Sequence, residues 1–496
     1  MIKNPELQRN LWLEITLQRI IAMPAILGLI YFIFFIASSD YSSRLVSLLV
    51  ISKIIFVILV LWGTRNASAS IVNEINQKTW DFQKLSSISP WQMTIGKLLG
   101  STLYTWYGAI IALAIYGVSL YLLYQYSLDD SKTTWSGWNF RKYENLTVAI
   151  IYYKVVTLFL GAILIQALAM FCAASALSNR KDKITNINTI GHMILSGGVG
   201  FFFFMTEQTL NGKRHYNVDW YNLDIDRGLF TVLSLAAFVF WVIVGIYRTI
   251  KKEFQYKIIP SAWFSFLLFV IIYQAGFFYK LPIIPMVFYS LVTLITIFYS
   301  LIFIEPKELT IYKKMKFCIK AKKWKGFLEV MPLWMVTYLL AIFVAIIISI
   351  ISISPINLAE QTIWRGYNYK NMEIAKSPIY YAALAIVPIL MMGRDILIIH
   401  FCNLCLNRKR ADFTALIYIA ILYFITPAIL ALSGFKTIAN LFVPLPITRY
   451  VTGRSVPEFF LALTPAEAII AALSQLLIMY LIFIRRMRKV NKESYI

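Results

Sequence analysis

The sequence predicts an all-α, polytopic membrane protein, and three observations support this fold class. Of the 496 residues, 59% are hydrophobic and only 14% are charged, and the mean hydropathy is +0.69, far above the apolar content of a soluble globular chain. Uninterrupted apolar runs of about twenty residues, the length that spans a bilayer as a helix, recur along the chain. The alternating segments that a membrane β-barrel requires are absent from the sequence.

Twelve apolar runs are long enough to cross the membrane, and each is expected to form one helix. In chain order they cover residues 20–37, 45–63, 98–124, 148–177, 188–206, 229–247, 260–279, 281–304, 330–352, 378–402, 413–435 and 465–484. The segment before the first run carries charges up to Arg19 and has no small-residue cleavage site. It lacks the pattern of a removable signal peptide, and we expect it to remain attached.

The distribution of lysine and arginine predicts the orientation of these helices. With a cytoplasmic N-terminus, the inside segments hold 30 of the 47 basic residues, the outside segments hold 14, and three lie within apolar runs. Cytoplasmic loops of helical membrane proteins carry such an excess of positive charge. We therefore expect a multi-pass protein of the bacterial cytoplasmic (inner) membrane with both termini in the cytoplasm.

The formal net charge of +23 has the same origin. Most of the excess lies in short cytoplasmic loops, where it sets the topology and faces anionic headgroups, so membrane lipids are expected partners and nucleic acid is not. The richest basic stretch, residues 313–326, has aromatic residues among its lysines. It can form an amphipathic helix in the membrane interface or a solvated loop that fixes the topology.

The chain is expected to consist of two six-helix transmembrane halves, residues 1–250 and 251–496. The tripeptides IYY at 151–153 and NRK at 179–181 both recur 228 positions later. The twelve apolar runs also match pairwise, six with six, at offsets between 225 and 240. Because six is even, both halves enter the membrane from the same side, which predicts two parallel pseudo-repeats.

Residues 70–97 form a polar, tryptophan-bearing segment between the second and third runs. Within it Ile71, Ile75, Phe82 and Leu85 recur at helical spacing beside charged residues. This pattern predicts an amphipathic helix with one apolar stripe, lying on or under the inner surface of the membrane.

A second helix is predicted to begin at Pro90. Ser89 is a suitable N-cap, Pro90 fits the first helical position, and Gln92 completes a Ser-x-x-Gln capping box. This helix can continue through Lys97 into the third span. The in-plane helix would then be coupled to a membrane helix by one capped corner.

The same segment resembles a known family. Its pattern consists of Glu74, Lys78, Thr79, Trp80, Asp81, Leu85, Pro90, Gly96 and Lys97. It resembles the cytoplasmic signature of ABC transporter type 2 (ABC-2) permeases, in which an acidic residue, Gly-Thr-x-Glu, a leucine-containing stretch, a proline and Gly-Lys precede the third helix. Lys78 stands at the usual glycine and Asp81 at the usual glutamate. The N-terminal NPELQRNLWLEI is similar to that family's opening, with Asn4 as N-cap and Pro5 as the first residue of an amphipathic helix.

The resemblance implies the permease subunit of an ATP-driven exporter, which is a transport subunit and not an enzyme. In that family the loop before the third helix is a coupling helix that sits in a groove of the ATPase. The residues implied in this coupling are Glu74, Thr79, Trp80, Asp81, Leu85, Pro90, Gly96 and Lys97. No Gly-x-x-x-x-Gly-Lys-[Ser/Thr] motif occurs in the sequence, so ATP and Mg²⁺ would be bound by separate ABC ATPase subunits, in two copies.

The second half departs further from this signature. Its equivalent loop, residues 305–329, is basic and lacks the Thr-x-Glu and Gly-Lys elements. The unequal loops predict one strong and one degenerate ATPase contact. The family also implies short re-entrant helices on the outer side at 436–464, a segment with several proline and glycine breakers.

Charged side chains within the apolar runs are further candidates for a functional site, because charge in hydrocarbon is costly and usually faces a cavity or a partner. Arg394 and Asp395 lie in the middle of the tenth run, and Lys53 lies in the second. Neighbouring residues of a helix point about 100° apart, so Arg394 and Asp395 need not pair. A role in the transport pathway or gating and a role in pairing between helices both remain open for them, whereas pairing is favoured for Lys53.

Two other classes of protein fit parts of the pattern. A secondary transporter coupled to an ion gradient has the same outline of twelve spans in two parallel halves, but the long second loop and short central segment differ from the typical major-facilitator pattern. A polytopic enzyme, such as a lipid-linked glycosyltransferase, would need acidic groups in an outer loop, where Asp129 and Asp130 form the only doublet. The CNLC sequence at Cys402 to Cys405 lacks a second ligand pair, so no metal site is expected.

Overall fold

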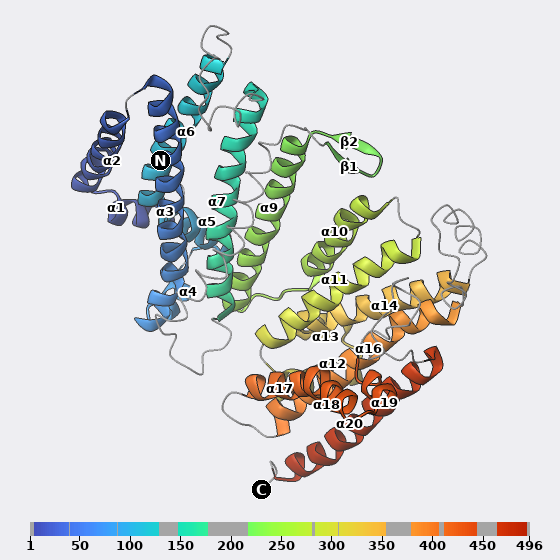
Figure 1. Cartoon of the computed structure of the whole chain (residues 1–496). Coiled ribbons are helices and arrows are strands. Elements are labelled where there is room, and N and C mark those ends of the chain that lie inside the picture. Colours follow the sequence, from blue (N-terminus) through green and yellow to red (C-terminus); the bar gives the residue numbers. More distant parts are fainter. Residues whose placement is uncertain are drawn as a thin grey trace, which may run out of the picture. The chain divides into compact units, whose positions relative to one another are not determined.

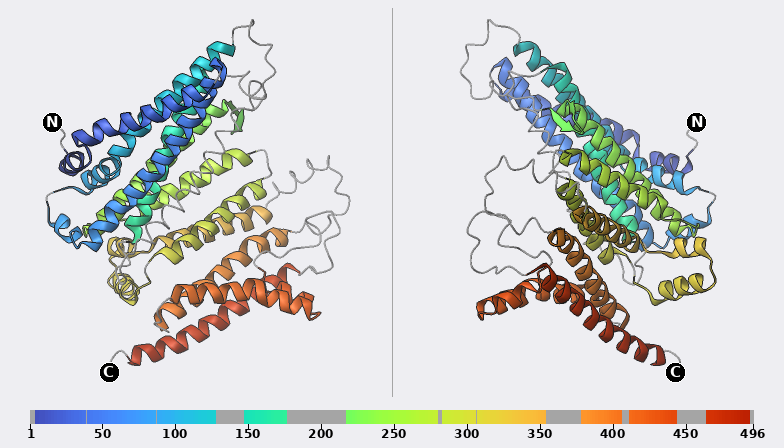
Figure 2. Two further views of the ribbon diagram at one scale, coloured as in Figure 1. Left: turned by 60° about the vertical axis from the view of Figure 1, so that its left-hand side comes forward. Right: turned by 90° about the vertical axis from the view of Figure 1, so that its right-hand side faces the viewer.

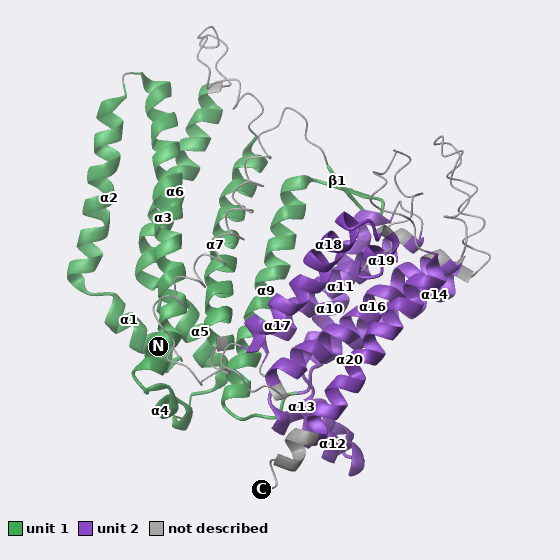
Figure 3. Cartoon of the chain, turned by 60° about the horizontal axis from the view of Figure 1, so that its bottom comes forward, with its two compact units in different colours: residues 1–258 green, residues 259–496 purple. Residues whose placement is uncertain are grey.

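The computed structural model describes residues 4–38, 40–86, 88–127, 147–176, 217–279, 283–305, 307–353, 378–405, 411–443 and 464–493. The chain divides into two compact units, Met1–Ile258 and Ile259–Ile496 (Figure 3). Each unit is a bundle of long helices with its own buried apolar core.

Eleven helices in the described part of the chain are long and apolar enough to cross a membrane. They cover Leu17–Ala37, Tyr41–Asn76, Leu103–Tyr126, Val148–Ser175, Arg227–Glu253, Ser261–Phe278, Met286–Phe303, Leu333–Ser352, Tyr381–Asn403, Ala411–Leu432 and Pro465–Arg488. The predicted helical, multi-pass class is therefore confirmed. The fifth predicted span, 188–206, lies outside the described residues.

Unit 1 contains a short N-terminal helix, long membrane helices and two short helices at one end of the bundle. Its elements are α1 (Pro5–Glu14), α2 (Leu17–Ala37), α3 (Tyr41–Asn76), α4 (Trp80–Leu85), α5 (Pro90–Gly100), α6 (Leu103–Ser127), α7 (Val148–Ala176), β1 (Val218–Trp220), β2 (Leu223–Ile225) and α9 (Arg227–Glu253). Helix α3 packs along both α6 and α7, and α7 packs along α9 (Figures 1 and 2). Residues such as Phe56, Leu59, Ala112 and Tyr116 fill the interior between these helices.

Unit 1 also contains a β-hairpin that the all-α prediction did not include. In it Val218 pairs with Ile225 and Trp220 pairs with Leu223. The two turn residues, Tyr221 and Asn222, have φ of 50° and 61°, the left-handed conformation that a two-residue type I′ hairpin turn requires. The hairpin immediately precedes α9, whose first turn is capped by Asp226.

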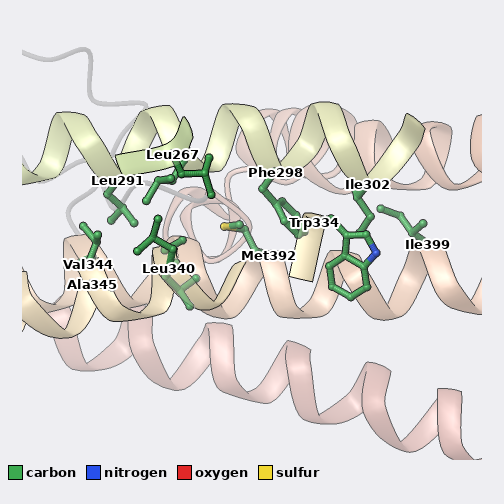
Figure 4. Close-up of a cluster of buried hydrophobic side chains, with 14 of the residues drawn as sticks. Leu267, Leu291, Phe298, Ile302, Trp334, Leu340, Val344, Ala345, Met392 and Ile399 are labelled. Atoms are coloured by element: carbon green, nitrogen blue, oxygen red, sulfur yellow. The ribbon is translucent and has the colours of Figure 1, made fainter. Parts of the chain in front are cut away.

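Unit 2 is also a bundle of long helices with short helices between them. They are α10 (Ser261–Phe278), α11 (Ile283–Ile304), α12 (Leu309–Lys320), α13 (Trp324–Val330), α14 (Leu333–Ile353), α16 (Pro378–His400), α17 (Ala411–Ala420), α18 (Thr426–Leu432), α19 (Lys436–Asn440) and α20 (Pro465–Glu493). Helix α14 packs between α11 and α16, and α16 packs along α20 (Figure 1). Figure 4 shows Phe298, Trp334, Leu340 and Met392 filling the interior between these helices.

Two wider π-helical turns interrupt the helices of unit 2, at Phe401–Cys405 after α16 and at Ile421–Ile425 between α17 and α18. Such turns add a residue to one helical turn and often occur at functional positions. The predicted re-entrant segment 436–464 begins with the five-residue helix α19, and its remainder from 444 to 463 lies outside the described residues.

Candidate functional site

The N-terminal helix α1 is held against α5 by its own capping residue. The side chain of Asn4 accepts hydrogen bonds from the backbone N–H groups of Glu6 and Leu7, at 3.1 and 3.2 Å, and Pro5 occupies the first helical position. The predicted cap at Asn4 is therefore confirmed. The amide Nδ2 of the same Asn4 donates to the carbonyl oxygen of Gln92 at 2.8 Å, which joins the start of α1 to the start of α5.

Two glycines four positions apart on α5 allow this close packing. A Cβ atom at Gly96 would lie 2.7 Å from Cβ of Glu6, and a Cβ atom at Gly100 would lie 2.6 Å from Cβ of Asn10. Both distances are too short for a real side chain, so α1 can approach α5 only because these two positions carry no Cβ. The spacing is the small-xxx-small pattern of closely packed membrane helices. Gly96 was a candidate only because of the family resemblance. The packing of α1 on α5 now explains why this position carries a glycine.

Helix α3 ends in a tight turn at Lys78. The N–H of Lys78 donates to the carbonyl oxygen of Ile75 at 3.1 Å, and the N–H of Thr79 donates to that of Glu74 at 2.9 Å. These two bonds form a Schellman motif, in which the residue after the cap adopts a left-handed conformation. Lys78 has a φ of 58°. This is the position at which the resembling family carries glycine, the residue that adopts such a φ at least cost.

The turn at Lys78 corrects one sequence prediction. Residues 71–85 do not form a single amphipathic helix, because Ile71 and Ile75 belong to the end of α3 while Phe82 and Leu85 belong to the separate helix α4. Ile71 is fully buried, whereas Phe82 and Leu85 are 75% and 85% exposed. The apparent apolar stripe therefore combines a core-facing end of α3 with an outward-facing surface of α4.

The capped corner before α5 agrees with the sequence. The Oγ of Ser89 accepts a hydrogen bond from the N–H of Gln92 at 3.2 Å, and Oε1 of Gln92 accepts one from the N–H of Ser89 at 3.1 Å. This is the predicted capping box, with Pro90 as the first residue of α5. A two-residue turn at Ser101 and Thr102 separates α5 from α6, so the new helix does not run unbroken into the span.

Four charged side chains meet where α1, α3 and α5 converge. The ammonium of Lys97 forms ion pairs with Glu74 and, at 3.2 Å, with Glu6. The guanidinium of Arg9 contacts Glu6 at 2.8 Å and Glu74 at 2.9 Å. Two acids and two bases from three helices thus balance each other, and we call these four residues the corner cluster.

Two residues of α4 complete the corner cluster. Nε2 of Gln83 donates to Oε1 of Glu74 at 2.6 Å, and Nζ of Lys97 lies 5.6 Å from the ring centre of Trp80, within the range of a cation–π contact. Trp80 is only 3% exposed. These contacts attach α4 to the ends of α3 and α5.

The corner cluster is largely removed from solvent. The side chains of Lys97 and Glu6 are 1% and 2% exposed, that of Glu74 is 12% exposed, and only Arg9, at 47%, reaches the surface. A buried ion pair adds little net stability because both ions lose their hydration, but removing one partner leaves a buried charge uncompensated, at about 3–5 kcal/mol. The cluster therefore fixes the geometry of the corner.

The outward surface of α4 contrasts with this interior. Phe82 and Leu85 are exposed, and the carboxylate of Asp81 is 69% exposed and lies 3.5 Å from Lys84. Lys84 in turn contacts Glu253 at the end of α9, at 3.4 Å. Two apolar side chains and one carboxylate thus project from a short helix that is fixed on its other side.

The structure brings together some of the predicted coupling residues and separates others. Glu74, Trp80, Gly96 and Lys97 form or directly support the corner cluster. Thr79 closes the turn after α3 with a side-chain bond to the carbonyl of Glu74, and Pro90 begins α5. Asp81 and Leu85 point away from this group.

Sequence reasoning missed Glu6, Arg9 and Gln83 as members of this site. Glu6 and Lys97 are 91 positions apart, and no local pattern links a residue of the first helix to one of the third span. The available signal was weaker: Asn4 and Pro5 mark a helix start, and the two glycines of α5 mark a face on which another helix could pack.

A second polar group lies inside unit 2, within the membrane-spanning part of α16. Oδ1 of Asp395 accepts from Nε and Nη2 of Arg394 at 2.9 and 2.8 Å, and Oδ2 accepts from the hydroxyls of Tyr299 and Tyr423 at 2.6 and 2.7 Å. Nη1 of Arg394 donates to Oε1 of Gln475 on α20. We call these five residues the intramembrane network.

The intramembrane network pairs residues that the sequence left unpaired. Arg394 and Asp395 do contact each other although they are adjacent, because the long arginine side chain folds back onto the neighbouring carboxylate. Tyr299 comes from α11 and Tyr423 from the π-helical turn at Ile421–Ile425, so the pair also connects neighbouring helices. Lys53, the third predicted intramembrane charge, is partly buried in α3 and belongs to the other unit.

No family model, curated protein or solved structure matches this chain. The function is therefore argued from the two polar groups themselves. Among the described residues, no group of three or more histidine, cysteine, aspartate or glutamate side chains is arranged to hold a metal ion. The charges of the corner cluster come from three helices, whereas the charged pair of the intramembrane network lies on α16 and is joined to neighbouring helices by Tyr299, Tyr423 and Gln475.

Proposed function

We propose that this multi-pass protein is the permease subunit of an ATP-driven ABC exporter of the ABC-2 type. In this proposal α4 is the coupling helix, the corner cluster transmits its movement to α3 and α5, and separate ATPase subunits supply the energy. The ATPases face the end of unit 1 that carries α1, α4 and α5, which is the cytoplasmic end according to the distribution of basic residues.

The observation that carries this proposal is the contrast between the two sides of α4. Its inner side is fixed by Trp80 and Gln83, while its outer side presents Phe82 and Leu85. Exposed apolar side chains next to a carboxylate are typical of a protein contact surface. A short helix that is fixed on one side and exposed on the other can transmit a displacement from a bound partner to the helices that hold it.

The length of α3 supports the same interpretation. Its 36 residues extend over about 54 Å, whereas the hydrocarbon core of a bilayer is about 30 Å thick. Helix α3 therefore projects well beyond the hydrocarbon. Glu74 is the third residue from its end, which supports a position of the corner cluster outside the hydrocarbon, behind the exposed surface of α4.

We also infer that the two units are copies of one six-helix plan. In unit 2 the N–H groups of Lys322 and Lys323 donate to the carbonyls of Ile319 and Cys318 at 3.1 and 2.9 Å, another Schellman turn. Lys322 has a φ of 54°, and α13 begins two residues later at Trp324, as α4 begins two residues after Lys78.

The packing of the long helices supports this inference. In unit 1 the helix that leads into the turn, α3, packs on the helix that follows it, α6, and α7 packs on α9. In unit 2 the corresponding pairs are α11 with α14 and α16 with α20. The bundles differ in the middle, since α7 otherwise packs mainly on α3 in unit 1 whereas α16 otherwise packs mainly on α14 in unit 2. The inference therefore rests on the order of the elements, the turn and these two pairs.

A secondary transporter coupled to an ion gradient remains the second candidate, and the intramembrane network is the place to look for its coupling residue. All four hydrogen bonds at Asp395 come from Arg394, Tyr299 and Tyr423. A carboxylate whose acceptor positions are filled by protein donors is poorly prepared to take up a proton. This arrangement favours a structural role for Asp395 and thus the ATP-driven candidate.

The proposal is tested on the full chain carrying an affinity tag, purified in mild detergent from its native host. ATP hydrolysis that co-elutes with the chain, and the subunit responsible for it, are measured for the unaltered protein and for the double variant Phe82→Asp, Leu85→Asp. We expect the double variant to lose the co-eluting ATPase, because two new carboxylates would be buried without partners in the contact surface.

A matched control places the same charges on another exposed apolar pair. The variant Tyr256→Asp, Ile259→Asp changes residues that are 55% and 41% exposed in the linker after α9, and it should retain the ATPase. Both variants should elute as folded protein at the volume of the unaltered chain. An ATPase that co-elutes equally with all three forms, or with none, would overturn the proposal.

A further inference from the structure

The helical hairpin α12–α13 of unit 2 carries a basic surface that the coupling proposal does not use. Lys313, Lys316, Phe317 and Lys320 are all exposed and follow the spacing i, i+3, i+4 and i+7, which places them on one face of α12. Trp324, the first residue of α13, is 64% exposed. We call these five residues the lysine face.

The lysine face combines positive charge with exposed apolar side chains. Phe317, on the same face as the lysines, is 62% exposed. Met315 and Cys318, on the opposite face of α12, are buried. The inner face of α12 thus packs on the protein, and its outer face carries both lysines and an aromatic ring. Lysine together with phenylalanine and tryptophan is the composition that binds the headgroup region of a membrane.

The hairpin is attached at the ends of two membrane helices. Helix α11 ends at Ile304 and α14 begins at Leu333, and the carboxylate of Glu305 accepts from the N–H groups of Leu333 and Trp334 at 3.1 and 3.2 Å. This contact holds the two feet of the hairpin together. Helices α12 and α13 lie side by side and turn away from the direction of the spans (Figure 2).

A further hydrogen bond keeps α12 close to the membrane end of the bundle. The hydroxyl of Tyr312 lies 2.6 Å from Nε2 of His400, which is the last residue of the membrane helix α16. Since Tyr312 is only one position away from Lys313, the start of the lysine face is held at the level where the membrane helices end. In the proposed orientation this end of the bundle faces the headgroups of the cytoplasmic leaflet.

The charge of this segment differs from that of the coupling segment in unit 1. Residues 307–325 contain eight lysines and one glutamate, whereas residues 78–92 contain two lysines and one aspartate. Helix α4 presents apolar groups beside a carboxylate, while α12 presents apolar groups beside lysines only. Two such different surfaces are unsuited to the same partner, even though both belong to the segment between the second and third membrane helices of their unit.

We propose that the lysine face of α12–α13 binds the anionic lipid headgroups of the cytoplasmic leaflet. The phosphates lie against Lys313, Lys316 and Lys320, and the rings of Phe317 and Trp324 enter the boundary between headgroups and acyl chains. This assignment requires the proposed orientation of the membrane helices, but it does not require an ATPase. A second protein contact at the same place is the competing possibility that the experiment separates.

The test uses the full chain in nanodiscs of phosphatidylcholine that contain a small share of lipid with a quenching spin label near the headgroup. The label is carried either by phosphatidylglycerol, which is anionic, or by phosphatidylcholine, which is neutral overall. The signal of Trp324 is obtained as the fluorescence difference between the unaltered chain and the Trp324→Phe variant. We expect labelled phosphatidylglycerol to quench this signal at a markedly lower share of labelled lipid than labelled phosphatidylcholine does.

The charge requirement is tested with the double variant Lys316→Gln, Lys320→Gln. Each lysine near an anionic surface contributes about a fivefold preference, so loss of the pair should lower the preference for phosphatidylglycerol roughly thirtyfold. The matched control Lys252→Gln, Lys257→Gln removes two exposed lysines, one from the last turn of α9 and one from the linker after it, and should leave the preference unchanged. The conservative variant Lys316→Arg, Lys320→Arg should keep the preference and shows that any loss is due to charge.

Three results would overturn the proposal. The Trp324 signal would be insensitive to both labelled lipids if the lysine face were in solvent or covered by protein. Equal quenching by the two lipids would show apolar insertion without headgroup recognition. A double glutamine variant that loses co-eluting ATPase activity while keeping its lipid preference would assign this face to a protein partner. The lipid readout is independent of ATP hydrolysis. A negative result in the quenching experiment therefore does not contradict the exporter proposal, which is tested by the co-eluting ATPase.

Discussion

Lys97 and Glu74 form an ion pair across 23 positions of the chain and thereby join the short helix α5 to the end of the membrane helix α3. Neither residue lies within a predicted apolar run, where a charge would indicate a site inside the membrane. Their pairing, extended by Glu6 and Arg9, turns three separate helix ends into one rigid corner. The first predictions concern this corner.

Replacing Lys97 by methionine should destabilise unit 1 by about 3–5 kcal/mol, because Glu6 and Glu74 would share a buried site with too little positive charge. The loss is measured as the change in unfolding of the purified chain in micelles, by denaturant or heat. The double variant Lys97→Met, Glu74→Gln should recover part of the loss, since it removes the excess negative charge.

The exposed pair of Lys84 with Asp81 provides the control for this prediction. Asp81 is largely solvated, and surface ion pairs contribute about 0–1 kcal/mol. We expect Asp81→Asn to change stability by less than any substitution of Lys97. Equal effects of Lys97→Met and Asp81→Asn would contradict the view that burial makes the corner cluster important.

Replacing Gly96 by alanine should loosen α1 from α5. The added methyl group would lie 2.7 Å from Cβ of Glu6, and the backbone of α1 must move to relieve this contact, at about 1–3 kcal/mol. Hydrogen exchange of the α1 amides is the appropriate measurement and should become faster. Gly28→Ala in α2, where no atom lies within 4 Å of the new Cβ, should leave α1 unaffected.

Replacing Lys78 by glycine should stabilise the protein by about 0.5–1 kcal/mol, because glycine adopts the left-handed conformation of this turn without the cost that a Cβ imposes. Lys322→Gly should behave in the same way, since Lys322 has a similar φ of 54°. Lys84→Gly, inside α4, should instead destabilise by about 1 kcal/mol. Thermal unfolding of the three variants distinguishes the two effects, and a destabilising Lys78→Gly would show that the lysine side chain itself is needed.

Removing the carboxylate of Asp395 should be far more costly than removing a hydroxyl that contacts it. Asp395→Ala leaves Arg394 without its counter-charge inside the membrane, at about 3–5 kcal/mol, whereas Tyr299→Phe removes one of four hydrogen bonds, at about 1–3 kcal/mol. Both are measured by thermal unfolding. Transport driven by a proton gradient that disappears in a stable Asp395→Asn variant would instead support the secondary transporter.

The salt bridge at the foot of α12 predicts a dependence on pH. Lys307 lies 2.8 Å from Asp412, and burial, partly opposed by the nearby carboxylates, lowers the pKa of Lys307 below its usual 10.5. The folded chain therefore releases this proton at a lower pH than the unfolded chain. Between the two pKa values the unfolded state binds more protons, so the free energy of unfolding should rise with pH in that window.

The variant Lys307→Met isolates this effect from the other groups that titrate at alkaline pH. Measured relative to Lys307→Met, the unfolding free energy of the unaltered chain should rise as the pH rises through the window, because methionine does not titrate. A difference that stays constant over the same range would mean that Lys307 has the same pKa in both states.

Local patterns of the sequence predicted local structure correctly. The cap at Asn4 and the box formed by Ser89 and Gln92 appear as expected, because each depends on residues within four positions of one another. The apolar runs in the described part of the chain became membrane helices for a similar reason: hydrocarbon leaves a backbone no alternative to internal hydrogen bonds.

The sequence was misleading where the structure depends on an unusual residue or on distant contacts. The turn between α3 and α4 was hidden because Lys78 occupies a conformation usually marked by glycine. The partners of Lys97 could not be predicted, since Glu6 joins it only through the packing of α1 on two glycines of α5. The pairing of Arg394 with Asp395 depends on side-chain rotamers, which helix geometry alone does not determine.

The uninterrupted α3 of unit 1 has no equal among the described helices of unit 2, where α11 ends at Ile304 and α12 begins at Leu309. A continuous helix conserves the separation and orientation of its ends, while a non-helical joint absorbs rotation. In the proposed exporter, displacement applied to α4 would therefore reach the far side of the bilayer through α3. Displacement applied to α13 would pass largely to α14, because the carboxylate of Glu305 at the joint accepts from the N–H groups of Leu333 and Trp334. A motor acting on this chain would then drive its two halves through different helices.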